Sequence, residues 1–257
     1  MARKANPPSG FPLTAVSLFT GAGGLDLGFA RAGFDIRLCI ERDPSAVATL
    51  RANGITRIWQ ADISDERVVT PRRILGKAGL RAGELGLVIG GPPCQPFSQP
   101  GTRRGLRDAR GQLVYHFARL VRGLRPRAFV FENVSGILSG QMKGAIELLT
   151  RIVGKTGAAG GGYQVEIGVL NAADYGVPQL RNRTFVVGWR GRGCFYFPAP
   201  THYRPDRQID RENRPKLRRC PTVGDALRGL PAPEPPSSHA VKVAATVPQR
   251  NREWHGK

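Results

Sequence analysis

Short apolar runs alternate with stretches of helical periodicity along the first two thirds of the chain. Four runs have the length of buried strands, namely residues 15–19, 36–40, 85–89 and 129–131. In residues 25–32 and 113–124, apolar side chains recur three or four positions apart, which is typical of helices packed on one face. Strands that alternate with helices predict an α/β fold, with a mostly parallel sheet and helices on both faces.

Local signals add detail to this prediction. Asp43 can cap a helix that begins at Pro44, and Gly54 lies just past the expected end of that helix. Two more apolar segments, residues 165–170 and 184–189, flank a loop and not a helix. Because antiparallel strands need no helical crossover, we expect these two strands at an antiparallel edge of the sheet.

The chain is strongly basic, and its composition changes near residue 197. Lys and Arg total 39 against 19 Asp and Glu, a net charge of +20, which favours a polyanionic partner such as nucleic acid. Ten of the 21 prolines lie between Pro198 and Pro248, where apolar periodicity fades. We therefore predict a flexible arm over residues 1–13, one folded domain over residues 14–197, and a linker or incomplete module over residues 198–257.

Several classes of protein are disfavoured. No apolar run approaches the roughly 18 residues of a membrane span, and no signal sequence is visible, so we expect a cytoplasmic protein without a membrane partner. The four cysteines have no spacing that suits zinc, which predicts a reduced chain without a metal site. We interpret three of them as buried apolar residues: Cys39, Cys194 and Cys220.

A glycine-rich turn follows the first predicted strand and could hold a nucleotide-like cofactor. Its glycines let a ligand approach the backbone and the free N–H groups of the next helix. Glu41 lies 20 residues after Gly21, at the end of the second strand, where a carboxylate can bind ribose hydroxyls. Asp62 could face an adenine edge from the end of another strand. The spacing suits NAD as well as S-adenosylmethionine, so the pattern predicts an adenosine-type cofactor.

Reactive side chains follow two further strands. Cys94 comes after Pro92 and Pro93, which hold the backbone rigid beyond the strand at 85–89, so its thiol should lie beside the cofactor as a nucleophile. Glu132 closes the next strand, where a carboxyl could share a proton with a ring nitrogen. Further along, Arg181 and Arg183 share a side if extended, and they could bind a base carbonyl or a phosphate.

A mobile, arginine-rich loop is expected after Cys94. The glycines at 101, 105 and 111 favour movement, and Arg103, Arg104 and Arg107 could contact phosphates if residues 98–111 close over a nucleic acid. Three later arginines repeat at helical spacing and read as the solvated face of a helix: Arg119, Arg122 and Arg125.

Taken together, these segments resemble the cytosine-C5 DNA methyltransferases, in that family's order, over about residues 14–190. The matching motifs are Phe19-Thr20-Gly21-x-Gly23-Gly24, Pro92-Pro93-Cys94-Gln95-Pro96-Phe97-Ser98, Glu132-Asn133-Val134 and Gln179-x-Arg181-x-Arg183. The resemblance implies a Rossmann-like S-adenosylmethionine-dependent methyltransferase fold, with residues 14–197 as the catalytic domain. It also implies methyl transfer from S-adenosylmethionine to C5 of cytosine in double-stranded DNA, within a restriction–modification system.

The resemblance assigns roles to individual residues. Cys94 would add to C6 of a flipped-out cytosine, Glu132 would hold N3 and the amino edge, and Arg183 would hold the base carbonyl with support from Arg181. The implied cofactor contacts are Phe19, Gly21, Gly23, Gly24, Leu25, Glu41, Asp62, Ile63, Pro93 and Leu113. The implied DNA contacts are Gln95, Ser98, Gln99, Arg103 and Arg104.

Part of the family pattern has no match between Pro198 and Lys257. The target-recognition region and a last Gly-Asn motif that completes the cofactor pocket are not found there. We therefore expect a second, complementing chain that supplies both, with a truncated product or an inactive relic as alternatives. Other readings are a tRNA cytosine methyltransferase, a non-catalytic nucleic-acid-binding protein, and an NAD-dependent oxidoreductase. The oxidoreductase leaves the Pro-Cys-Gln segment and the arginine pair without a role.

Overall fold

The computed structural model describes residues 10–93, 109–139, 143–154, 162–204 and 217–229, and every structural statement below concerns these residues. They form a seven-stranded sheet in the order β3-β2-β1-β4-β5-β7-β6. The five parallel strands are β1 (Thr14–Leu18), β2 (Asp35–Glu41), β3 (Ile58–Gln60), β4 (Leu87–Gly90) and β5 (Ala128–Val134). The remaining strands, β6 (Gln164–Asn171) and β7 (Asn182–Trp189), pair antiparallel with each other, and β7 also pairs antiparallel with β5. The mostly parallel sheet with an antiparallel edge is confirmed.

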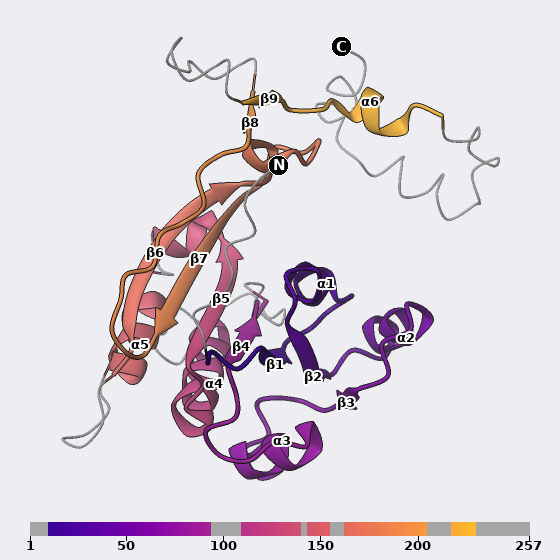
Figure 1. The fold of residues 1–257 in the computed structure, drawn as a ribbon. Coiled ribbons are helices and arrows are strands. Elements are labelled where there is room, and N and C mark those ends of the chain that lie inside the picture. The colour runs from indigo at the N-terminus through magenta and orange to yellow at the C-terminus, as the bar shows by residue number, and fades with distance from the viewer. Residues whose placement is uncertain (1–9, 94–108, 140–142, 155–161, 205–216, 230–257) are drawn as a thin grey trace.

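Helices cover both faces of this sheet. They are α1 (Gly24–Arg31), α2 (Pro44–Ala52), α3 (Pro71–Ala78), α4 (Ala109–Leu124) and α5 (Lys143–Gly154). In Figure 1, α1 and α2 lie to the right of the sheet, whereas α3, α4 and α5 run along its lower and left side. This arrangement confirms the predicted α/β fold, although α3 and α5 were not among the predicted helices.

The alternation of side chains along the strands divides the core into two layers. Val16 and Leu18 of β1 belong to the large apolar cluster that includes Phe117 of α4 and Leu149 of α5. Ala15, which precedes Val16, points to the opposite face, in a smaller cluster packed against α1. Because neighbouring residues of a strand face opposite ways, one apolar run serves both layers.

Helix α2 has the caps that the sequence predicts. The Asp43 carboxylate accepts hydrogen bonds from the backbone N–H groups of Ser45 (2.8 Å) and Ala46 (3.0 Å), and Pro44 is the first helical residue. Gly54, with φ +76°, follows the helix in the left-handed conformation that glycine tolerates. Thr70 caps α3 in the same way, 3.3 Å from the N–H of Arg73.

The segment beyond residue 197 packs against the turn that precedes β7. This turn contains the short helix η4 (Ala172–Tyr175), and the segment contains β8 (His202–Tyr203), β9 (Arg218–Arg219) and α6 (Val223–Leu227). The carbonyl of Asp174 accepts from Thr201 N at 2.9 Å, and its carboxylate is 3.1 Å from Arg204 Nε. Residues 198–204 are therefore anchored to η4 by a backbone hydrogen bond and a largely buried ion pair.

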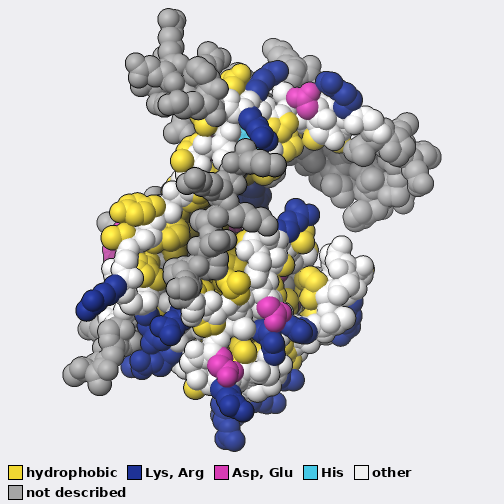
Figure 2. All heavy atoms as spheres, viewed as in Figure 1, with side chains coloured by type: hydrophobic (Ala, Val, Ile, Leu, Met, Phe, Trp, Pro, Cys, Tyr) yellow, Lys and Arg dark blue, Asp and Glu magenta, His cyan; other side chains and the backbone are white. Residues whose placement is uncertain are grey.

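Basic side chains are more prominent than acidic ones on the face seen in Figure 2. Figure 2 shows Lys and Arg side chains around the lower part of this face, with few acidic side chains among them. None of the helices in the described part of the chain is both long and apolar enough to cross a membrane. Of the three cysteines interpreted as buried, Cys39 and Cys220 are buried but Cys194 is exposed, so that interpretation is wrong for Cys194.

Candidate active site

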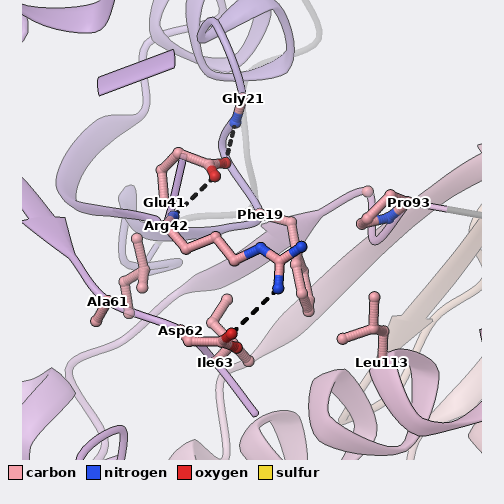
Figure 3. Close-up of a pocket in the computed structure, with 11 residues that line it drawn as sticks. Phe19, Gly21, Glu41, Arg42, Ala61, Asp62, Ile63, Pro93 and Leu113 are labelled. Atoms are coloured by element: carbon pink, nitrogen blue, oxygen red, sulfur yellow. Dashed lines mark hydrogen bonds and ion pairs between the residues drawn. The ribbon is translucent and has the colours of Figure 1, made fainter. Parts of the chain in front are cut away.

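A cavity of about 210 Å³ lies at the carboxyl ends of the parallel strands and is closed on one side by α4. Figure 3 shows the residues around it. Its lining consists of Phe19, Gly21, Ile40, Glu41, Arg42, Ala61, Asp62, Ile63, Gly91, Pro93 and Leu113. Seven of the ten residues that the resemblance assigns to the cofactor are in this set, and Gly23, Gly24 and Leu25 are not. The fold therefore brings most of the implied cofactor contacts to one place.

The glycine turn depends on two unusual backbone conformations. Phe19 was predicted as the last residue of the first strand, but the strand ends at Leu18 because Phe19 has φ +54°. A positive φ is uncommon for a bulky residue and is a signature of a functional or strained position. Gly23, at φ +86°, caps α1, and a Cβ there would lie 2.8 Å from Leu50 Cδ2. Gly23 thus allows close packing, while Phe19 and Gly21 line the pocket itself.

Glu41 ties the glycine turn to the start of α2. Its Oε2 accepts from Gly21 N at 2.7 Å, and its Oε1 accepts from the backbone N–H groups of Arg42 (2.7 Å) and Asp43 (2.8 Å). A carboxylate has about four acceptor positions, so these three bonds leave room for one ligand hydroxyl. Glu41 can therefore support the loop and contact a ribose at the same time.

Asp62 lies two residues beyond β3 and accepts three hydrogen bonds. Its Oδ1 accepts from Ser64 N (2.9 Å) and Ser64 Oγ (2.6 Å), and its Oδ2 is 3.1 Å from Arg42 Nη1. Partial burial alone would raise the pKa of Asp62, but these hydrogen bonds and the Arg42 charge together hold the pKa below its usual value. A ligand amino group at this carboxylate has to share Oδ2 with Arg42.

Four residues of the pocket were not predicted from the sequence: Ile40, Arg42, Ala61 and Gly91. Each lies within two positions of a predicted residue, and the sequence offered no other signal for them. In Figure 3 the Arg42 side chain extends along the pocket towards Asp62 and passes in front of Phe19. The glycine-loop pattern did not predict the positive charge that Arg42 brings to the pocket.

The second part of the site is a carboxylate–guanidinium pair at the junction of β5 and β7. Glu132 Oε1 is 2.8 Å from Arg183 Nε. In the antiparallel register Val134 faces Arg183, so Glu132 and Arg183 are diagonal neighbours within reach of long side chains. The structure therefore brings together two of the predicted catalytic residues. Arg181 is exposed, one residue before β7 begins.

The Glu132 pair is joined to the pocket through β4 and the residues that follow it. A Cβ on Gly91 would lie only 2.8 Å from Glu132 Oε2, so a larger residue here would force the Glu132 carboxylate to shift. The neighbouring Asn133 is buried and donates from Nδ2 to the carbonyl of Pro92 at 3.0 Å. Strand β5 thus fixes the backbone immediately before Pro93, which lines the pocket.

Several predicted residues lie outside the described part of the chain. They are Cys94, Gln95, Ser98, Gln99, Arg103, Arg104 and Arg107, so their proposed roles stay predictions. Among the described cysteines, burial and the nearby Asp26 charge raise the pKa of Cys39 to about 12, which keeps that thiol protonated. The described residues contain no cluster of His, Cys, Asp and Glu side chains that could hold a metal ion.

One arginine interpreted as part of a solvated helix face has a different environment. Arg119 of α4 is mostly buried, with Nε 3.3 Å from the Glu66 carboxylate. Arg122 and Arg125 are exposed, as expected. The interpretation of Arg119 as a surface charge is therefore wrong, because α4 packs that side of the helix against the loop after β3.

The sheet order and a pocket at the strand ends define a Rossmann-like fold of the S-adenosylmethionine-dependent methyltransferase type. The chain resembles a solved E. coli prophage protein described as a DNA modification methyltransferase, with a TM-score of 0.61 and 32% identity over 86% of this chain and 56% of that one. It also resembles the S. pombe Dnmt2 methyltransferase in fold, with a TM-score of 0.53 and 19% identity over 71% of this chain and 50% of that one.

The family follows from the sequence comparison. Residues 13–229 match the family described as C-5 cytosine-specific DNA methylase, and the chain belongs to this family. It is 43% identical to the type II methyltransferase M.AquIA of Picosynechococcus sp., over 94% of this chain and 98% of that protein. It is 40% identical to M.NgoPII of Neisseria gonorrhoeae, over 73% of this chain. The chain spans 51% of M.NgoPII, and about half the length of several other relatives that it matches.

Proposed function

We propose that this chain transfers a methyl group from S-adenosylmethionine to C5 of cytosine in double-stranded DNA, with Cys94 as the nucleophile. The observation that supports the proposal most directly is the 2.8 Å pair of Glu132 and Arg183 beside Gly91 at the mouth of the pocket. In cytosine, N3 is bonded to C2, which carries the carbonyl oxygen O2. A carboxyl group and a guanidinium side by side can therefore contact N3 and O2, respectively. This arrangement would hold an extruded pyrimidine next to the cofactor pocket.

The residues of the pocket fit the adenosine part of the cofactor. The ring of Phe19 offers an apolar face for adenine, and Glu41 retains an acceptor position for a ribose hydroxyl. Asp62 and Arg42 provide an acceptor and a donor at the opposite wall. S-adenosylmethionine supplies an electrophilic methyl group on a sulfonium. The task of the protein is then to turn C5 of cytosine into a nucleophile.

Cys94 and Glu132 would perform this activation together. The Cys94 thiolate adds to C6, and the electron pair of the C5–C6 bond moves towards C5 while Glu132 shares a proton with N3. C5 would then attack the methyl group as the bond from sulfur to that methyl breaks, which releases S-adenosylhomocysteine. Loss of the C5 proton to water would restore the C5–C6 double bond and expel the thiolate of Cys94. A cytosine inside a duplex hides C6, so the base has to be flipped out, at a cost of a few kcal/mol.

We propose in addition that a complementing chain supplies target recognition and the last cofactor motif. The support is the coverage of the relatives: this chain aligns with 98% of M.AquIA but with 51% of M.NgoPII. A relative of nearly the same extent shows that a catalytic region of this size is found as a protein in its own right. Base contacts outside residues 1–257 would then select the sequence.

The function can be tested without knowing the target sequence. The chain is expressed in a bacterial host that lacks cytosine methylation, alone and with the reading frame encoded beside it, and the host genome is analysed by bisulfite sequencing. We expect 5-methylcytosine in one short sequence motif when both frames are present, and none with Cys94→Ala. Methylation of tRNA in place of DNA, or no methylation in either arrangement, would contradict the proposal.

The covalent step has its own test. The substrate is a duplex that carries 5-fluorocytosine at the motif found by bisulfite sequencing, because the fluorine at C5 cannot be lost as the proton is. The protein should therefore remain attached to the DNA, and the complex should appear as a band that survives denaturing electrophoresis. Cys94→Ala should give no such band. Glu132→Gln should give less of it at equal DNA binding.

A further inference from the structure

One face of α4 connects the cofactor pocket with the loop that forms its wall. Residues 61–70, here called the pocket loop, run from β3 to α3 and include the pocket residues Asp62 and Ile63. Leu113, His116 and Arg119 follow at three-residue spacing, which places their side chains on one side of the helix. Leu113 lines the pocket, and the other two side chains contact the pocket loop.

Glu66 is the centre of these contacts. Its Oε1 lies 3.2 Å from His116 Nδ1 and 3.3 Å from Arg119 Nε. Arg119 also reaches across the loop, with Nη2 3.5 Å from the carbonyl of Ile63 and 3.3 Å from that of Val69. The side chains of His116 and Arg119 are only 12% and 19% exposed, whereas that of Glu66 is 46% exposed, so water reaches these contacts only from the side of the carboxylate. A single guanidinium thereby joins both ends of the loop to α4.

The C-terminal end of the pocket loop is held where α3 begins. Thr70 caps α3, and Pro71 packs so closely on α4 that a Cβ at Gly123 would lie 2.5 Å from Pro71 Cγ. The position of the loop is therefore set by α4 at both ends. Since Ile63 is buried and lines the pocket, a shift of the loop would change the pocket wall.

The groups around His116 make this contact sensitive to pH. Burial and the positive charge of Arg119 lower the pKa of His116, while Glu66, Asp62 and the hydrogen bond to Glu66 oppose them. The ring of Tyr115 packs edge-on at 5.3 Å and adds no charge at neutral pH. His116 is therefore neutral near pH 7, and acid places a second cation beside Arg119.

We propose that Glu66, His116 and Arg119 are positioning residues for the cofactor, which act by holding Asp62 and Ile63 of the pocket loop in place. This inference rests on the proposed function, because it takes the pocket to be the S-adenosylmethionine site. None of the three side chains lines the pocket, so they act through the loop and not by contact with the ligand.

The test is calorimetric titration of the full chain with S-adenosylmethionine and, separately, with S-adenosylhomocysteine. Arg119→Met should weaken binding of both about tenfold, because a displaced wall loses contacts to the adenosine part that the two ligands share. Arg119→Lys keeps the charge and should recover part of the affinity. The matched control is Arg122→Met on the exposed side of α4, which should leave the dissociation constant unchanged.

A pH series separates positioning from general damage. Affinity of the wild-type chain should fall as the pH is lowered below 6.5 and His116 becomes charged, and His116→Gln should remove most of that fall. If Arg119→Met does not fold by circular dichroism, Glu66→Gln, which keeps the side-chain size, replaces it and should weaken binding in the same direction.

Failure of this inference differs from failure of the proposed function. If the wild-type chain binds neither ligand, alone or with the complementing chain encoded beside it, the assignment of the pocket is wrong. If the wild-type chain binds but folded Arg119→Met and Glu66→Gln bind equally well, the positioning role is wrong and the pocket assignment stands. A pH dependence unchanged in His116→Gln would also contradict the role of His116.

Discussion

On the cofactor side of the site, the pocket residues follow the ends of parallel strands, and short loops place them within a few positions of each strand. On the base side, Glu132 and Arg183 are distant in sequence and meet only because β5 and β7 pair in one antiparallel register. In the proposed function the two sides also bind different molecules. Cofactor binding and base activation should then be separable, so that substitutions can damage one and spare the other.

We expect the largest effect from a substitution of Glu132, which should change methyl transfer but not cofactor binding. Glu132→Gln removes the acidic group that would share a proton with N3 and breaks the ion pair with Arg183, so methyl transfer should fall by about 10²–10⁴-fold. The dissociation constant for S-adenosylmethionine should stay within about twofold, since Glu132 does not line the pocket. Titration and methyl-transfer rates measured on the same preparation check this. A parallel loss of cofactor affinity would show that the two sides are not separable.

Gly91 lies where the two sides meet, and its substitution should give the next largest effect. In Gly91→Ala the new Cβ would be 2.8 Å from Glu132 Oε2, so the carboxylate has to move and methyl transfer should fall by about 10²-fold. Gly28→Ala in α1 is the control, because no atom lies within 4 Å of its Cβ position. The control should keep its activity and gain up to about 1 kcal/mol of stability. Equal activity of both variants would contradict the role of Gly91.

We expect a moderate effect on stability from the ion pair of Asp174 and Arg204 at the turn that precedes β7. Asp174 and Arg204 are 18% or less exposed, so Arg204→Met leaves a largely buried carboxylate without this cation and should lower the free energy of unfolding by up to about 3 kcal/mol. The exposed pair of Asp225 and Arg228 serves for comparison, and Arg228→Met should change stability by less than about 0.5 kcal/mol. Urea denaturation measures both. Similar values would mean that residues 198–204 do not stabilise the turn before β7.

We expect the smallest effect from Asp26, a buried residue of α1, the helix that follows the glycine turn. Burial raises the pKa of Asp26 above 3.8, although hydrogen bonds with Ser17 and Cys39 oppose the rise. The folded state therefore keeps a proton that the unfolded state loses first, and stability falls as pH rises through the interval between the two pKa values. Asp26→Asn should remove this decline, with a gain in Tm of about 2 °C at pH 7. Thermal melts from pH 3.5 to pH 7 check the difference between the two proteins.

Most of the cofactor side could be predicted from the sequence. The ends of β1 and β2 were visible as apolar runs, and the glycines, Glu41 and Asp62 followed them at interpretable spacing. Arg42 could not be predicted, because nothing in the sequence shows that its side chain turns back towards Asp62. The same limit applies to Arg119. Its helical spacing with Arg122 and Arg125 suggested solvent, and only the packing of α4 on the pocket loop places it inside.

Helix α3 illustrates a signal that was present but not used. Thr70 and Pro71 repeat the cap-and-proline pattern that located α2 at Asp43 and Pro44. The apolar content of α3 is low, so periodicity alone does not mark it. A capping signal is local and can be read from the sequence, whereas the face that a short polar helix buries depends on its neighbours.

By itself, the sequence determined the alternation of strands and helices with α1, α2 and α4 in place, the strand-end positions of most pocket residues, and the family to which the motifs point. These are local or periodic properties, and backbone sterics and hydrophobic patterning are sufficient for them. Only the tertiary structure decided that Glu132 lies against Arg183, that Arg42 binds Asp62, and that α4 holds the pocket loop. Those contacts depend on strand register and helix packing, which arise from the balance of many distant side chains and leave no spacing pattern along the chain.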